Sequence, residues 1–226
     1  MASSLEQLFV AYSELEDQFH LSSDYVELSS RLDEILQVLD DDTIIRQSVC
    51  IGLGNLSLED NTSLCQLVLW PFIVEKLDPS GDITLFAQDP IFTADDEEFL
   101  QMFGIHILNN PEAQEHITEE TLMFAPFVPW SVLVNEFIQD NSSPMFITQN
   151  LHRHSEVAIQ QYSARNGRFP NAFGGSRQEI ADSLDAVELF LEDMMPMELT
   201  ASDEEVGTAG AGLVLYWSLW ERPTFN

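Results

Sequence analysis

Basic residues are scarce in this chain. Its 226 residues include 8 Lys and Arg against 39 Asp and Glu, so the formal net charge is −31. Phosphate backbones and anionic membrane surfaces are held largely by Lys and Arg side chains. The composition therefore predicts neither a nucleic-acid partner nor an anionic membrane partner. The acidity serves solubility or provides an acidic recognition surface, and we favour the first interpretation.

Cysteine and long apolar runs are also scarce. Cys50 and Cys65 are the only cysteines, each lies in an apolar stretch, and they form no Cys-x-x-Cys pair. Buried, reduced thiols are therefore expected. No run approaches the ~18 apolar residues that a membrane helix needs, and the first residues lack the basic and apolar parts of a secretory signal. We expect a soluble protein of the cytoplasm or the nucleus.

The common catalytic motifs are missing as well. The sequence has no Gly-x-Ser-x-Gly elbow, no P-loop and no His-Glu-x-x-His, so no catalytic residue can be named. His152 and His154 are too few ligands for a metal, and no metal site is expected. The acidic residues 95–98 follow Thr93, and caps at the start of a helix explain them better than a metal does.

Half of the basic residues gather in one part of the chain. Arg153, Arg165, Arg168 and Arg177 lie there, close in sequence to the two histidines. Such a group could neutralise a small anion or an acidic patch of the chain itself. We favour the second interpretation, because excess carboxylates always offer partners.

The apolar segments predict an α/β fold. Two amphipathic helices are expected over residues 4–19 and 23–39, and short apolar runs then alternate with helical patterns. Such alternation indicates βαβ units with right-handed crossovers, and hence a three-layer, Rossmann-like, mostly parallel sheet with helices on both faces. The predicted strands are 48–53, 83–87, 105–109, 121–125 and 144–148, in the spatial order 3-2-1-4-5.

The remaining segments complete this prediction. Helices are expected over residues 62–77, with Pro71 kinking or interrupting the helix, and over 130–138, 155–163 and 178–194. Residues 197–211 are expected to form a mobile acidic linker. Residues 213–220 should then join the sheet as an antiparallel strand that buries Trp217 or Trp220. We therefore divide the chain into N-terminal helices, 1–45, that pack on a Rossmann-like domain, 46–226.

The strongest local pattern is residues 49–55, VCIGLGN, an apolar run followed by Gly52 and Gly54. It indicates a buried strand that ends in a tight turn, because glycine tolerates positive φ and lacks Cβ. The third glycine of the dinucleotide fingerprint is missing, since Ser57 stands in its place. The acidic residue about twenty positions further on is also absent, so an NAD or FAD site is weakly supported.

In open α/β sheets, ligands bind outside the carboxyl ends of the strands. We therefore expect Gly52, Gly54, Asn55, Asp89 and Pro126 to line one cleft. A looser glycine loop of this kind fits an adenosyl compound such as S-adenosylmethionine, with Asp89 on the ribose. Asp89 followed by proline is also typical of a turn that ends a strand, and we favour this second interpretation.

Four segments resemble the sensitivity-to-red-light-reduced domain family in their order and spacing. They are residues 49–55, 88–92 (QDPIF), 103–108 (FGIHIL) and 121–126 (TLMFAP), the last followed by Pro129. The resemblance implies a Rossmann-like fold and a role in signalling, with no assigned chemistry. It thus favours a regulatory or interaction protein with a protein partner, and a methyltransferase-like enzyme with an adenosyl cofactor is the alternative.

Two departures from the family pattern bear on that choice. Phe127 and Val128 stand where the family tends to carry His-Cys, and residues 208–217 lack its Asn-Asp and histidine. An enzyme needs positioned acid, base or nucleophile groups at the strand ends. The apolar pair therefore favours the regulatory protein over the enzyme.

Overall fold

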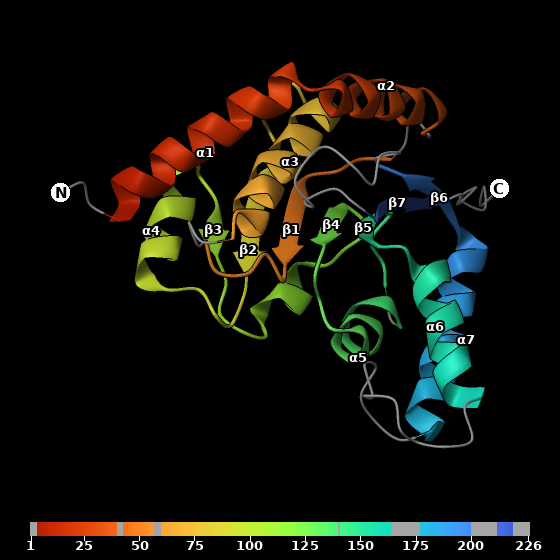
Figure 1. Cartoon of the computed structure of the whole chain (residues 1–226). Helices are drawn as coiled ribbons and strands as arrows, with labels where there is room; N and C mark the ends of the chain where they lie inside the picture. Colours follow the sequence, from red (N-terminus) through yellow and green to blue (C-terminus); the bar gives the residue numbers. More distant parts are fainter. Residues whose placement is uncertain are drawn as a thin grey trace.

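The chain forms a seven-stranded mixed sheet with helices on both faces (Figure 1). This computed structural model describes residues 4–39, 43–56, 60–139, 141–163, 177–199 and 212–218. The strand order is β3-β2-β1-β4-β5-β7-β6. Strands β1 to β5 are parallel, and β7 runs antiparallel to both β5 and β6. The three-layer α/β fold and the predicted order of the first five strands are confirmed.

The central strands are buried on both faces. Every residue of β4 is buried, and in β1 only Gln47 is partly exposed. Strands of this kind are continuous apolar runs, which is why the sequence located them well. The strands are β1 (Gln47–Ile51), β2 (Thr84–Gln88), β3 (His106–Ile107), β4 (Thr121–Ala125), β5 (Met145–Gln149), β6 (Met194–Glu198) and β7 (Leu213–Ser218).

Four helices cover one face of the sheet. They are α1 (Ser4–Leu21), α2 (Ser23–Val38), α3 (Thr62–Leu77) and α4 (Ala94–Met102). Leu8 and Tyr12 of α1 and Leu28 and Leu32 of α2 lie in the same core cluster as the buried face of α3, so the N-terminal pair packs on the core. None of the described helices is long and apolar enough to cross a membrane.

The helix α3 runs through Pro71 without interruption, so of the two effects expected there, a kink or an interruption, the interruption is wrong. Proline removes one backbone donor from a helix. Nine of the sixteen residues of α3 are buried against the sheet and the N-terminal helices, and this packing outweighs the lost hydrogen bond.

The other face carries α5 (Trp130–Val132), which continues as the π-helical segment η2 (Leu133–Ile138), together with α6 (Leu151–Ser163) and α7 (Arg177–Asp193). A short 3-10 helix, η1 (Glu112–His116), follows β3. The helix predicted from residue 155 begins four residues earlier. The Asn150 side chain accepts a hydrogen bond from Arg153 N at 3.0 Å and so caps α6.

The expected linker from residue 197 is wrong at its beginning, because residues 194–198 form the edge strand β6. Leu199 N donates to Leu213 O at 3.0 Å, so the backbone groups of Leu199 face β7. Backbone groups of successive residues in a strand point to opposite sides, and the nitrogen of Pro196, three residues earlier, therefore faces the open edge. No donor is needed there, so proline is tolerated and protects the edge from further pairing. Residues 200–211 lie outside the described residues.

The antiparallel strand β7 is confirmed, but the tryptophans are not its main buried residues. Tyr216 is fully buried, Trp217 is partly buried, and Trp220 lies outside the described residues. The Tyr216 hydroxyl oxygen accepts a hydrogen bond from Leu151 N at 2.9 Å and so holds the first residue of α6. Burial raises the pKa of Tyr216 to about 12.

Replacing Tyr216 by phenylalanine should lower the free energy of unfolding by about 1–3 kcal/mol, because the buried Leu151 N–H then lacks an acceptor. Urea unfolding measures this change. Tyr25→Phe is the matched control, since the Tyr25 ring packs on Phe72 and its hydroxyl has no hydrogen bond in the described part of the chain. Equal losses in the two variants would show that the bond to α6 contributes nothing.

Candidate functional site

The candidate site lies at the carboxyl end of β1, in the middle of the sheet. β1 pairs in parallel with β2 on one side and with β4 on the other. The order of the strands therefore reverses at this point, and open α/β sheets form their ligand crevice at such a reversal. The segments that follow β1, β2 and β4 all begin at this edge of the sheet (Figure 1). We refer to it as the strand-end site.

Gly52 is fixed by the segment that follows β4. Its φ is +74°, and a Cβ there would lie 2.8 Å from Val128 Cγ2 and 3.3 Å from Val128 N. The Gly52 N–H donates to the carbonyl oxygen of Gln88 at 3.4 Å. The glycine is therefore required both by its backbone conformation and by the close approach of Val128.

Gly54 and Asp89 meet directly. Gly54 N donates to Asp89 Oδ2 at 2.8 Å, and Ile91 N donates to Asp89 Oδ1 at 3.0 Å. Both oxygens of the half-buried carboxylate thus accept backbone N–H groups. Asp89 therefore links the turn after β1 to the end of β2. It is both a turn residue and a neighbour of the glycine loop, the two positions that the sequence suggests for it.

A second carboxylate acts on the same turn. Asp96 Oδ1 accepts a hydrogen bond from Leu56 N at 3.1 Å, while its Oδ2 accepts one from Thr93 N at 2.7 Å. The predicted cap is confirmed, because Thr93 and Asp96 form a capping box at the start of α4. The sequence does not reveal the bond to Leu56, because it joins residues 40 positions apart.

The other two predicted site residues take different positions. Pro126 follows β4 and is buried, and the exposed Asn55 lies on the surface of the turn. Phe127, which follows Pro126 in the chain, is 45% exposed. The structure therefore brings Gly52, Gly54 and Asp89 together, with Pro126 beneath the surface. Whether a ligand binds there stays a prediction, and residues 57–59 of the turn lie outside the described residues.

The nearby thiols are poor nucleophiles. Burial, and then the charge of Asp89, raise the pKa of the Cys50 thiol well above its usual range. Burial and the charge of Asp60 raise the pKa of Cys65 in the same direction. Both side chains are therefore protonated at neutral pH, and a thiol reacts only as its thiolate.

The predicted basic group is only partly visible. The exposed Arg153 has no ion pair with a carboxylate of the described residues, so the favoured internal neutralisation is not seen for it. Burial and the charge of Arg153 lower the pKa of His154. Arg165 and Arg168 lie outside the described residues, as does the side chain of Arg177. The described residues hold no cluster of three or more His, Cys, Asp or Glu side chains suited to a metal.

Gly52→Ala should lower the free energy of unfolding by about 2–5 kcal/mol, since it combines a strained left-handed backbone with a clash at Val128. Gly81→Ala is the matched control: Gly81 has a φ of +77° and no atom within 4 Å of a Cβ, so only the backbone strain of about 1–2 kcal/mol applies. Chemical denaturation measures both variants.

Adding Val128→Ala to the Gly52→Ala variant should restore part of the loss, because it removes the atom that the new Cβ meets. Equal destabilisation of Gly52→Ala and Gly81→Ala, without any recovery in the double variant, would contradict the packing role assigned to Val128.

Comparisons with known proteins identify a family. The model of the SRR1 domain matches residues 27–199, more than half of the chain. Among curated proteins nothing matches. The crystal structure of the SAH-bound methyltransferase PaMTH1 of Podospora anserina is similar over 96% of this chain and 88% of that chain, with 11% identity and a TM-score of 0.38; a likeness this distant carries no argument. The family match confirms the resemblance that the four sequence segments indicate: the chain belongs to the SRR1 domain family.

Proposed function

We propose that this chain is an intracellular regulatory or interaction protein, which acts through contacts with another protein and not through a reaction at the strand-end site. One observation carries the proposal: both oxygens of Asp89, the acid best placed to hold a ligand there, accept hydrogen bonds from the chain's own backbone. A ligand hydroxyl would have to displace Gly54 N–H or Ile91 N–H, and each displaced group would need a new acceptor.

The surrounding chemistry supports the same conclusion. General acid–base and nucleophilic catalysis need titratable groups that are free to react and positioned at the substrate. The thiol of Cys50 is buried and protonated, and Asp96 is engaged by Leu56 and the cap of α4. The segment after β4 presents Phe127, an apolar side chain, at the surface. An interaction protein needs none of these groups to be reactive.

Adenosyl-compound binding is the second candidate function, and a specific observation favours it. A turn with two positive-φ glycines and a carboxylate 2.8 Å from its backbone lie at the point where the strand order reverses. This is the place where open α/β sheets bind small ligands. On this alternative, Asp89 would exchange Gly54 N–H for the ribose hydroxyls of an adenosyl compound such as S-adenosylmethionine.

Two measurements on the full chain, isothermal titration calorimetry and thermal unfolding, separate the two functions when S-adenosylmethionine or S-adenosylhomocysteine is added. We expect no saturable heat of binding and no rise in the midpoint of thermal unfolding with either compound. Asp89→Ala should then act on folding alone, and lower the free energy of unfolding by about 1.5–3 kcal/mol because it removes a charged acceptor of two backbone N–H groups.

Asp95→Ala is the matched control, since Asp95 is an exposed acid in the first turn of α4. Its loss should cost about 0.3–1 kcal/mol through the helix dipole. Saturable micromolar binding of an adenosyl compound that Asp89→Ala and Gly52→Val abolish, and that Asp95→Ala retains, would overturn the proposed function in favour of the alternative.

A further inference from the structure

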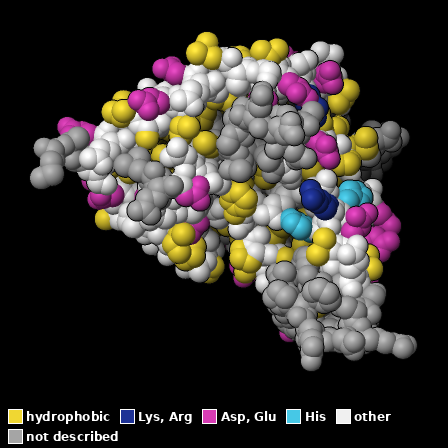
Figure 2. All heavy atoms as spheres, in the orientation of Figure 1, with side chains coloured by type: hydrophobic (Ala, Val, Ile, Leu, Met, Phe, Trp, Pro, Cys, Tyr) yellow, Lys and Arg dark blue, Asp and Glu magenta, His cyan; other side chains and the backbone are white. Residues whose placement is uncertain are grey.

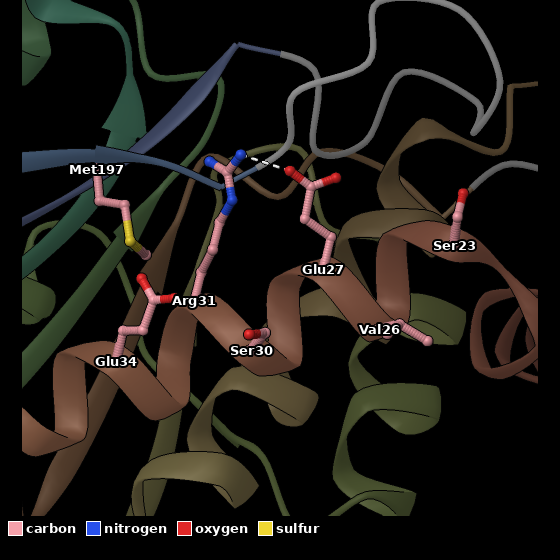
Figure 3. A pocket seen from close by; sticks show the side chains of 7 residues that line it. All are labelled: Ser23, Val26, Glu27, Ser30, Arg31, Glu34 and Met197. Carbon is pink, nitrogen blue, oxygen red and sulfur yellow. Dashed lines mark hydrogen bonds and ion pairs between the residues drawn. The ribbon is translucent and has the colours of Figure 1, made fainter.

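A groove opens far from the strand-end site, between α2 and the edge strand β6 (Figure 3). It has a volume of about 770 Å³, and one wall is a single face of α2. Figure 3 shows Met197 extending from β6 toward Glu34, while Glu27 and Arg31 reach toward each other. Its lining residues are Ser23, Val26, Glu27, Ser30, Arg31, Glu34 and Met197. We refer to it as the α2–β6 groove.

The groove offers apolar contacts to a partner. Val26 is 66% exposed, although it lies on a helix whose opposite side is packed into the core. Met197 lines the groove from β6 and is partly buried, and Met195 on the same strand is 41% exposed. Exposed apolar side chains beside a hollow are typical of interaction sites. They are suited to receive an apolar side chain of another protein.

The charge of the groove is negative. The guanidinium of Arg31 donates to the Glu27 carboxylate and to the Glu198 carbonyl oxygen, so its positive charge is already matched. Glu34 lines the groove, is exposed, and has no ion pair with any cation of the described residues. Acidic side chains are also spread over the face of the molecule in Figure 2, where Lys and Arg appear in few places. A positively charged group would therefore be attracted here.

We propose that the α2–β6 groove binds a short segment of a partner protein that carries Lys or Arg next to an apolar side chain. The inference rests on the proposed function and names the surface and the partner chemistry for it. Recognition is by side chains and not by addition of a strand to β6. Pro196 presents no N–H at the open edge, and the outward carbonyl of Glu198 is occupied by Arg31.

Charge complementarity selects this occupant over two others. The sequence that follows β6, residues 200–211, includes Asp203, Glu204 and Glu205 and no Lys or Arg, so it would be repelled by Glu34. A second copy of the chain carries the same net charge of −31 and would be repelled as well. A basic segment of a different protein is repelled neither by Glu34 nor by the net charge of the chain.

Fluorescence anisotropy with a labelled peptide of repeated Lys-Leu-Lys units tests the proposal, with a Glu-Leu-Glu peptide as the negative probe. Glu34→Lys should weaken binding of the basic peptide by about tenfold or more, because an attraction becomes a repulsion. Glu188→Lys is the matched control: it makes the same change of charge at an exposed position of α7, away from the groove. It should weaken binding by less than about twofold. Val26→Ser should weaken binding without any change of charge.

Equal losses in Glu34→Lys and Glu188→Lys would overturn the proposal, since they would show that the peptide is attracted by net charge alone. Amide shifts of the ¹⁵N-labelled protein that avoid residues 23–34 on addition of the peptide would do the same. Sedimentation velocity tests whether a second copy of the chain occupies the groove. Self-association that Glu34→Lys abolishes would make the groove an interface between copies and would overturn the proposal. None of these readouts involves an adenosyl compound, so failure here is distinct from failure of the proposed function.

Discussion

The carboxylate of Asp89 holds the turn after β1 against the end of β2, and the arrangement of the strand ends depends on this contact. Gly54 N and Ile91 N both donate to it, and Asp96 makes a comparable contact one turn further along through Leu56 N. Two acids from the segment between β2 and β3, Asp89 and Asp96, thus accept hydrogen bonds from the backbone of the turn between β1 and α3. Charged acceptors make the stronger hydrogen bonds, so the two acids add to the apolar contacts of the turn, whose Leu53 and Leu56 are buried in the core.

The same edge is closed from the other side by the segment after β4. A Cβ on residue 52 would lie 2.8 Å from Val128 Cγ2, so the close approach of the valine depends on the glycine. Deeper in the sheet, the Ser48 hydroxyl accepts a hydrogen bond from Trp70 Nε1 at 2.7 Å and donates to Leu122 O at 3.1 Å, which joins α3, β1 and β4. The centre of the sheet is therefore held by polar contacts as well as by burial.

The sequence predicts the parts of this fold that depend on burial. The parallel strands are continuous apolar runs, and their order follows from the handedness of βαβ units. The edge strand β6 could not be predicted, because Pro196 and Glu198 interrupt the apolar pattern that identifies a strand. An edge strand tolerates such residues, since one side of its backbone is unpaired.

The sites show the same limit. Glycines and an acid at strand ends predict that Gly52, Gly54 and Asp89 come together, but not that Asp89 is taken by backbone N–H groups. At the α2–β6 groove, Arg31 donates a hydrogen bond to the carbonyl oxygen of Glu198, 167 positions away in the sequence. No local sequence pattern predicts such a contact. Periodicity thus locates elements, whereas the partners of polar side chains depend on tertiary packing.

The Gly54 amide resonance in a ¹H–¹⁵N spectrum reports most directly on the central claim, since Gly54 N–H donates to Asp89. If Asp89 keeps this bond, the resonance keeps its position and its rate of hydrogen exchange when S-adenosylmethionine is added in excess. A saturable shift of the Gly54 and Ile91 amides together, with faster exchange of both, would show that a ligand takes the carboxylate and would contradict the account.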